Sequence, residues 1–274
     1  MPNNNVAEVL WTGGWDSTYR LLELLLVQRR AVQPRYIIDT GRPSTINEIK
    51  TIAKIRHQIV GDHPELEVLI RPLLISLASD VKQSKDLKKW HDDLSAGNSQ
   101  FPIQYHWLAE YARTNNIEGM ELSVEKKPGG ILYELLKGNV SEVRSHADSY
   151  YVVKTDPKPD SLRLFSAFRF PVLETDKPAM QRLAVAHGFD SYLNMTWFCH
   201  RPISGRPCGT CSPCRDTADA GLAYRIPWYN RTVRRNVHRP LSKAWQTLLE
   251  GLRPRRRLRA IKAMLMPADS KQQP

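Results

Sequence analysis

Apolar and polar positions change period several times along the first 190 residues, as they do when strands alternate with helices. Residues 6–11 form a short apolar run that predicts a buried strand, and two glycines follow it. Apolar residues then recur at helical spacing over residues 16–30. The same patterns predict strands at 36–39, 66–74, 120–124 and 162–170, and helices at 44–60, 105–113 and 177–188.

These elements predict an α/β fold with a doubly wound, mostly parallel sheet that helices cover on both faces. The polar stretch 82–98 predicts a loop or an irregular helix. In open parallel sheets, ligands bind beyond the carboxyl ends of the strands. Segments 12–17 and 39–44 follow the first two predicted strands, so both are candidates for binding residues.

The first of these segments has the composition of a phosphate-binding loop: Trp11-Thr12-Gly13-Gly14-Trp15-Asp16-Ser17-Thr18. Paired glycines let a backbone turn tightly and approach a phosphate, and the start of the following helix adds a partial positive charge. Thr12, Ser17 and Thr18 supply hydroxyl donors. Asp16 supplies a carboxylate that can hold magnesium or position a leaving pyrophosphate. The alternative is a plain turn in which Asp16 and Ser17 cap the helix.

All four cysteines lie close together near the other end, as Cys199-x8-Cys208-x2-Cys211-x2-Cys214. Zinc takes four tetrahedral ligands, and Cys-x2-Cys units bring sulfurs to one centre through tight turns. Four protein ligands fill the coordination sphere, so the pattern predicts a structural zinc. An iron–sulfur cluster and a redox-active pair are the alternatives.

The chain has 274 residues and a formal net charge of +12, and this charge lies at one end. Residues 221–274 contain 13 Lys and Arg against 2 Asp and Glu, whereas residues 1–220 are nearly neutral. Such a tail favours an anionic partner, although a solvated arginine-rich face is the simpler interpretation. Its arginines alternate with Trp228, Tyr229 and Trp245, which also suits a zinc-stabilised nucleic-acid-binding module.

Membrane insertion and export are not expected from the sequence. No apolar run approaches the roughly 18 residues of a membrane span. The first ten residues lack the basic start and apolar stretch of a signal peptide. We therefore expect a cytoplasmic protein.

The loop Thr12-Gly13-Gly14-Trp15-Asp16-Ser17 resembles the SGGxDS signature of the PP-loop ATP pyrophosphatases, with threonine in place of the first serine. Together with the cysteine motif, it makes the chain similar to the 7-cyano-7-deazaguanine synthase (QueC-like) family of queuosine biosynthesis. Asp39-Thr40-Gly41-Arg42, the run from Phe170 to Lys177, and Thr196-Trp197-Phe198-Cys199 also resemble segments of that family. The resemblance covers roughly residues 6–222.

The resemblance implies a PP-loop (HUP-like) ATP-binding domain over residues 1–195, a zinc-binding motif over 196–222 and a basic extension over 223–274. It implies ATP and Mg²⁺ at the loop, and Zn²⁺ at the four cysteines. The implied ATP-binding residues are Trp11, Thr12, Gly13, Gly14, Trp15, Asp16, Ser17 and Thr18. Asp16, Ser17 and Lys177 are the implied catalytic residues, and Asp39 and Arg42 the implied substrate-binding residues.

The implied enzyme is an ATP-dependent C–N ligase that works as a homodimer. It adenylates the carboxylate of 7-carboxy-7-deazaguanine, ammonia converts this to the amide, and a second activation gives the nitrile. Two segments depart from the family pattern. Residues 98–104 stand where the family has its PGRN substrate loop, and residues 124–130 replace its SGYPDCR-like segment.

Since these loops would hold the deazapurine, ATP chemistry is the better-supported part of the expectation. A divergent paralogue that joins the deazaguanine to a protein amine, as in anti-phage defence, needs the same adenylate. Other PP-loop chemistry, such as tRNA thiolation, stays open too. The non-enzymatic alternative is the nucleic-acid-binding module, with the basic tail holding RNA, DNA or an acidic protein surface.

Overall fold

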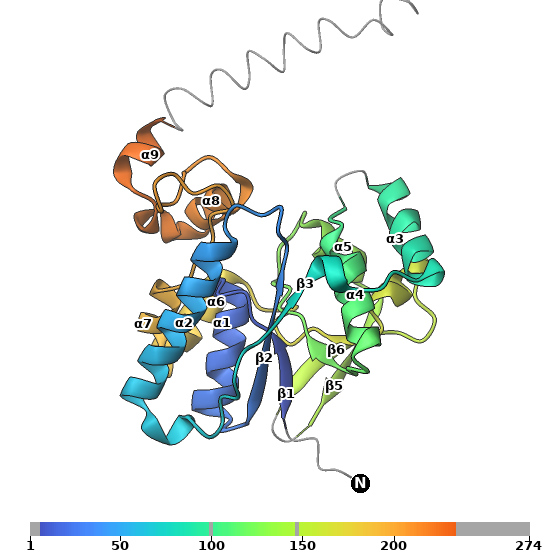
Figure 1. Cartoon of the computed structure of the whole chain (residues 1–274), viewed down its shortest axis with the longest axis horizontal. Coiled ribbons are helices and arrows are strands. Elements are labelled where there is room, and N and C mark those ends of the chain that lie inside the picture. Colours follow the sequence, from blue (N-terminus) through green and yellow to red (C-terminus); the bar gives the residue numbers. More distant parts are fainter. Residues whose placement is uncertain (1–5, 99–100, 146–147, 234–274) are drawn as a thin grey trace, which may run out of the picture.

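The computed structural model describes residues 6–98, 101–145 and 148–233. Within these residues, five parallel strands form a central sheet in the order β3-β2-β1-β4-β7 (Figure 1). The strands are β1 Ala7–Leu10, β2 Val32–Ile38, β3 Leu74–Leu77, β4 Met120–Glu121 and β7 Phe168–Arg169. The predicted α/β fold with a parallel sheet is confirmed.

Helices lie on both sides of this sheet (Figure 1). One side carries α1 Trp15–Leu22, α2 Thr45–Asp62, α6 Lys177–Ala186 and α7 Asp190–Asn194, and the other carries α3 Lys85–Gly97, α4 Gln104–Thr114 and α5 Ile131–Leu136. Each side has its own hydrophobic core. Leu21, Ile55 and Phe189 are buried in the first core, and Leu108 and Phe165 in the second. Apolar residues of β1 and β2 contribute to both, as buried strands of doubly wound sheets do.

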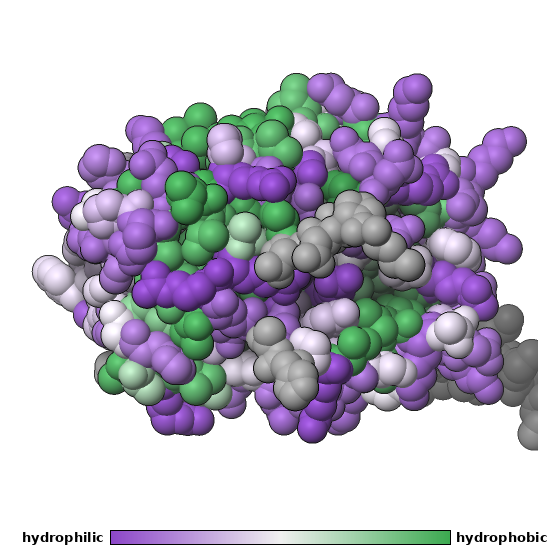
Figure 2. Space-filling view, turned by 90° about the horizontal axis from the view of Figure 1, so that it is seen from below, coloured by the Kyte–Doolittle hydropathy of each residue, from purple (hydrophilic) through white to green (hydrophobic). Residues whose placement is uncertain are grey.

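Two smaller units complete the described chain. The antiparallel hairpin of β5 Val140–Arg144 and β6 Ser149–Val153 lies beside β7. After α7 comes a cysteine subdomain with α8 Ser212–Thr217 and α9 Trp228–Val233 and a small core of its own. The face opposite this subdomain is mostly hydrophilic, with hydrophobic side chains in separate patches (Figure 2). No helix in the described residues is long and apolar enough to cross a bilayer.

Element boundaries differ from the predictions in three places. The second strand begins at Val32 and contains Pro34, which falls between the Val32–Ile70 bridge and the ladder that starts at Arg35 and Leu74. A proline is tolerated there because no ladder bond needs its missing N–H. The third strand is Leu74–Leu77, since residues 66–69 form a turn. Within the stretch 82–98, for which a loop or an irregular helix was predicted, Lys85–Gly97 form the regular helix α3.

The second half of the chain differs in two further elements. The predicted strand 120–124 is only the two-residue strand β4. The first part of the predicted strand 162–170 belongs to a 3₁₀ helix, Asp160–Phe165, which leaves only β7 in the sheet. The predicted divisions at residues 195 and 222 stay predictions. Residues 234–274, which hold most of the basic extension including Trp245, lie outside the described residues.

Candidate functional site

The strand order reverses between β1 and β4, because the chain runs from β1 through β2 to β3 on one side and adds β4 and β7 on the other. At such a reversal the loops after the two strands diverge and leave a crevice at their carboxyl ends. The loop after β1 leads into α1, and the loop after β4 contains Glu125. Lys177 enters the same crevice as the first residue of α6.

Gly13 fixes the shape of the β1–α1 loop. Its φ of 69° is in the left-handed region, and a Cβ there would lie 3.2 Å from both Glu48 O and Ile52 Cγ1 of α2. Its carbonyl accepts a hydrogen bond from the Trp197 N–H at 2.8 Å. Position 13 therefore requires glycine for its backbone angle and for its close approach to α2.

The eight residues of the predicted ATP loop divide into two groups. Trp11 and Thr18 are fully buried, and the Trp11 indole N–H donates to Thr18 Oγ1 at 2.9 Å. Trp15 is also buried, beneath the Arg225 guanidinium at 5.2 Å from its ring centroid. Together with Gly13, these residues build the loop rather than line a cavity. Thr12, Gly14, Asp16 and Ser17 do line one.

Two hydroxyl groups organise the cavity side of the loop. Thr12 Oγ1 and Ser17 Oγ lie 3.2 Å apart, and the Thr12 N–H donates to Ser17 Oγ at 3.3 Å. The Gly14 N–H contacts Thr12 Oγ1 at 3.4 Å. Helices leave their first N–H groups without intrahelical partners, so this end of α1 offers donors to an anion.

Asp16, Glu125 and Lys177 form a charged triad in the crevice. Lys177 Nζ lies 2.5 Å from Glu125 Oε1 and 3.2 Å from Asp16 Oδ1. Burial opposes the charge on Lys177, but the two carboxylates outweigh it and raise the pKa of the ammonium. Burial, followed by the charge of Asp16, raises the pKa of Glu125. With all three groups ionised, the triad carries one net negative charge, which suits a divalent cation.

Glu125 was not a sequence candidate. Its position just beyond the predicted strand 120–124 placed it at the carboxyl edge of the sheet, but only the strand order shows that this strand lies next to β1 at the switch point. Asp16 and Lys177 were predicted from separate motifs, and the sheet topology brings them together.

Two cavities of about 240 and 350 Å³ adjoin at the triad and share Thr12, Gly14, Asp16, Arg42 and His200 in their walls. The smaller is polar and contains Glu125 and Lys177. The larger is lined by Tyr36, Tyr105 and Trp107. A polar chamber beside an aromatic one suits a ligand with a charged part and a flat, ring-shaped part.

The two predicted substrate residues have different surroundings. Arg42 lines both cavities, where its Nη2 donates to Gln104 Oε1 at 2.9 Å and its Nη1 lies 3.8 Å from Glu48 Oε1. The Asp39 carboxylate instead accepts the Gly41 N–H at 3.0 Å, and Asp39 lines neither cavity. Asp39 thus shapes the loop that carries Arg42.

The four cysteine sulfurs converge and can hold a metal such as zinc. All four Sγ atoms lie within 4.8 Å of one another. Sγ separations are 3.5 Å for Cys211–Cys214 and 3.9 Å for both Cys208–Cys214 and Cys199–Cys211. A tetrahedral Zn–S₄ centre with bonds near 2.3 Å requires sulfurs about 3.8 Å apart. These separations exceed the S–S bond length of about 2.05 Å, so the cysteines are free thiols.

Backbone donors support the thiolate form of the cysteines. The Thr210 and Cys211 N–H groups both lie 3.4 Å from Cys208 Sγ, and the Cys208 N–H lies 3.2 Å from Cys199 Sγ. Thiol contacts from Cys199 and Cys214 lower the pKa of Cys211, and the same contacts raise the pKa values of Cys199 and Cys214. Gly209, with φ of 74°, has no room for a side chain, because a Cβ would lie 2.8 Å from Asn230 O.

The cysteine subdomain forms one wall of the smaller cavity. Trp197, Phe198 and His200 flank Cys199 in the sequence and line that cavity, as do Asp216 and Thr217 of α8. Asp216 Oδ2 pairs with Lys127 Nζ of the β4 loop at 2.8 Å. The cysteine cluster and the crevice therefore belong to one continuous structure.

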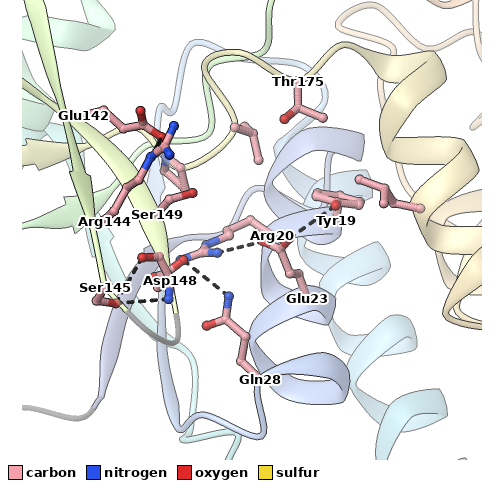
Figure 3. Close-up of a pocket in the computed structure, with 13 residues that line it drawn as sticks. Tyr19, Arg20, Glu23, Gln28, Glu142, Arg144, Ser145, Asp148, Ser149 and Thr175 are labelled. Carbon is pink, nitrogen blue, oxygen red and sulfur yellow. Dashed lines mark hydrogen bonds and ion pairs between the residues drawn. The ribbon is translucent and has the colours of Figure 1, made fainter.

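A separate polar cavity of about 530 Å³ lies between α1 and the β5–β6 hairpin (Figure 3). Arg20 is buried beside it and makes two hydrogen bonds to the Glu121 carboxylate, at 2.7 and 3.0 Å. Its other nitrogen contacts are with Glu23 and with Asp148 from the hairpin turn. The contact with Asp148 ties the hairpin to α1. Because its carboxylate partners already neutralise the Arg20 guanidinium, we assign this network a structural role.

No protein-family model matches the chain, and no curated protein sequence is significantly similar to it.

Proposed function

We propose that this protein is a PP-loop ATP-dependent C–N ligase, similar to the QueC-like enzymes, which adenylates a carboxylate for attack by a nitrogen nucleophile. The observation that carries the proposal is the triad of Asp16, Glu125 and Lys177 beside the glycine turn of the β1–α1 loop. A phosphate loop alone fits many nucleotide-binding proteins. A buried lysine between two carboxylates at the same point adds the groups that phosphate transfer requires.

The proposed roles follow from the chemistry of each group. The N–H groups at the start of α1 and the hydroxyls of Thr12 and Ser17 would bind the triphosphate. Asp16 and Glu125 would hold Mg²⁺, and the bound ion would offset the negative charge of the phosphates. Lys177 keeps its proton, because its carboxylate neighbours raise its pKa, and it would stabilise the charge that develops on the α-phosphate.

The reaction balances in two steps. A carboxylate oxygen of the substrate attacks the α-phosphorus of ATP, and the bond to the β-phosphate breaks to release pyrophosphate. A nitrogen nucleophile then attacks the acyl carbon of this adenylate and AMP leaves, while the nitrogen loses a proton to solvent or to a nearby carboxylate.

The larger cavity is the proposed site for the flat part of a substrate. Tyr36, Tyr105 and Trp107 offer ring surfaces for stacking on a deazapurine, and Arg42 offers a guanidinium for a carboxylate. Tyr105 and Trp107 come just after the segment 98–104, which differs from the family's substrate loop. The family substrate 7-carboxy-7-deazaguanine is therefore the first compound to test.

The test is mass spectrometry of the products formed from the protein, ATP, Mg²⁺ and 7-carboxy-7-deazaguanine, with ammonia or with candidate proteins. A free amide or nitrile supports the synthase, and a mass added to a protein supports the conjugating paralogue. If no AMP or pyrophosphate forms with any carboxylate and calorimetry detects no ATP binding, the proposal is wrong.

A matched pair of lysine variants tests the triad. Lys177→Met should lower AMP formation about 100-fold or more, as loss of a transition-state contact does. Lys126→Met removes an ammonium that is 43% exposed and pairs with Glu174 at 3.0 Å, and it should leave AMP formation near the wild-type rate. Equal rates for the two variants would exclude Lys177 from the chemistry.

A further inference from the structure

The loop between β4 and α5 places a second lysine beside the crevice. Glu125, which lines the smaller cavity, is followed by Lys126 and Lys127. The two lysines have different partners. Lys126 Nζ lies 3.0 Å from Glu174 Oε2, on the loop before α6. Lys127 Nζ lies 2.8 Å from Asp216 Oδ2 of α8. Since Asp216 lines the smaller cavity, Lys127 lies at the edge of that cavity.

A tight turn fixes the backbone at Lys127. The Gly130 N–H donates to the Lys127 carbonyl at 2.8 Å and closes a turn over residues 127–130. Pro128 and Gly129 occupy the two central positions, and Gly129 has a φ of 76°. A proline followed by a glycine with positive φ is the pattern of a type II turn. A Cβ at position 130 would lie 2.9 Å from the Lys127 carbonyl oxygen, so that position requires glycine as well. The local sequence therefore holds Lys127 in its place.

The walls of the smaller cavity have an excess of negative charge. Within the described residues, two cations and four carboxylates line it: Arg42 and Lys177, and Asp16, Glu48, Glu125 and Asp216. Like charges repel, so a phosphate chain is favoured in such a cavity only when further cations offset the carboxylates. Arg42 lies near Glu48, and Lys177 belongs to the triad. Neither of them accompanies Asp216, so the cation needed on that side must come from another residue.

Lys127 can supply this cation without leaving Asp216. A lysine ammonium has three N–H donors, and Asp216 is the one partner of this ammonium in the part of the chain that the structure describes. Donors therefore remain for a phosphate oxygen. The Lys127 and Asp216 side chains are 44% and 36% exposed, so a ligand can reach the pair. The charge of Lys127 also extends to the triad. Burial and Asp16 raise the pKa of Glu125, and the ammonium groups of Lys177 and Lys127 oppose that rise.

We propose that Lys127 binds the outer phosphates of the nucleotide and offsets the charge of the pyrophosphate that leaves. This inference rests on the proposed function, because it concerns the same nucleotide. Lys177 lies between the two carboxylates of the triad and acts at the α-phosphate, whereas Lys127 stands at the wall that the cysteine subdomain forms. Negative charge grows on the pyrophosphate when its bond to the α-phosphate breaks, and a cation beside it stabilises that charge. The two lysines thus divide the phosphates between them.

Calorimetric titration of the full chain with ATP and with AMP, in the presence of Mg²⁺, tests this contact. Lys127→Met should weaken ATP binding about tenfold or more, as loss of a hydrogen bond between charged groups does. It should leave AMP binding unchanged, because AMP lacks the outer phosphates. Lys126→Met is the matched control and should bind both nucleotides like the wild type, and Lys127→Arg should recover most of the ATP affinity. All three variants should melt close to the wild type, because exposed ion pairs contribute little to stability.

Asp216→Asn separates a contact with phosphate from the ion pair itself. This variant breaks the ion pair but keeps the ammonium, so its ATP affinity should stay close to that of the wild type. Three results would each overturn the role of Lys127 and leave the proposed function standing: equal losses of ATP affinity in Lys127→Met and Asp216→Asn, wild-type ATP affinity in Lys127→Met, or equal losses of ATP and AMP affinity in Lys127→Met. A wild-type protein that binds no ATP would instead refute both proposals.

Discussion

Substitution of Gly13 by alanine tests the conformation of the β1–α1 loop, on which the whole site depends. The added methyl group would meet two obstacles. The φ of 69° is unfavourable for a residue with a Cβ, and that Cβ would lie 3.2 Å from the Glu48 carbonyl and from Ile52 Cγ1. Neither obstacle can move easily, because both belong to the buried side of α2.

The expected loss of stability follows from these two effects. A left-handed conformation costs roughly 1–2 kcal/mol for a residue with a Cβ. Forcing a methyl group into a packed space costs roughly 1–3 kcal/mol. We therefore expect Gly13→Ala to reduce the free energy of unfolding by about 2–5 kcal/mol. At about 2–4 °C per kcal/mol, the melting temperature should fall by roughly 4–20 °C.

Two further glycines separate the two effects. Gly129 has a φ of 76° but open space around its Cβ position, so Gly129→Ala should show the backbone cost alone. Gly61 is helical in α2 and also has open space, so Gly61→Ala should stabilise by roughly 0.5 kcal/mol. Urea denaturation followed by circular dichroism measures all three. If Gly13→Ala costs no more than Gly129→Ala, the close approach of the loop to α2 does not exist.

Three other substitutions should have measurable effects. Arg20→Leu leaves buried carboxylates without their counter-ion and should cost about 3–5 kcal/mol in urea denaturation, whereas Arg29→Leu, from an exposed pair, should cost under about 1 kcal/mol. Cys208→Ser should release metal, measured by elemental mass spectrometry, and lower the melting temperature. Burial lowers the pKa of His106 in the folded protein. Below about pH 6.5 the unfolded chain therefore binds a proton at this histidine more readily than the folded chain, and the stability should decrease as the pH is lowered. His106→Gln should flatten this pH dependence, and replacement of the exposed His57 should leave it unchanged.

Local patterns were sufficient to predict the parts of the fold that depend on near neighbours in the sequence. The paired glycines after a short apolar run identified the β1–α1 turn, and Asp176 begins α6 by accepting the Ala179 N–H at 2.8 Å. The third strand was misplaced for a physical reason. Residues 66–70 are as apolar as a strand, but Leu66 is buried from a 3₁₀ helix, a turn follows it, and Ile70 forms only an isolated bridge to Val32.

Contacts between distant residues could not be predicted in this way. Arg20 and Glu121 are 101 positions apart, and a buried arginine looks like a surface arginine until its partner is known. The same holds for Glu125, which is one of many acidic residues in the sequence. It becomes a candidate only when the strand order places the β4 loop beside the β1–α1 loop.

A metal bound at the four cysteines would influence the crevice without touching a substrate. The segment that contains Cys199 also contains Trp197, whose N–H bonds to Gly13 O, and Phe198, which holds the Arg225 guanidinium at 5.0 Å from its ring centroid. The Arg225 guanidinium also lies over the Trp15 ring, at 5.2 Å from its centroid, so it connects the loop with the subdomain. A metal bound by the cysteines would order this wall too, because Cys199 belongs to the same segment. If a ligand in the crevice orders the same wall, binding of metal and binding of ligand should strengthen one another.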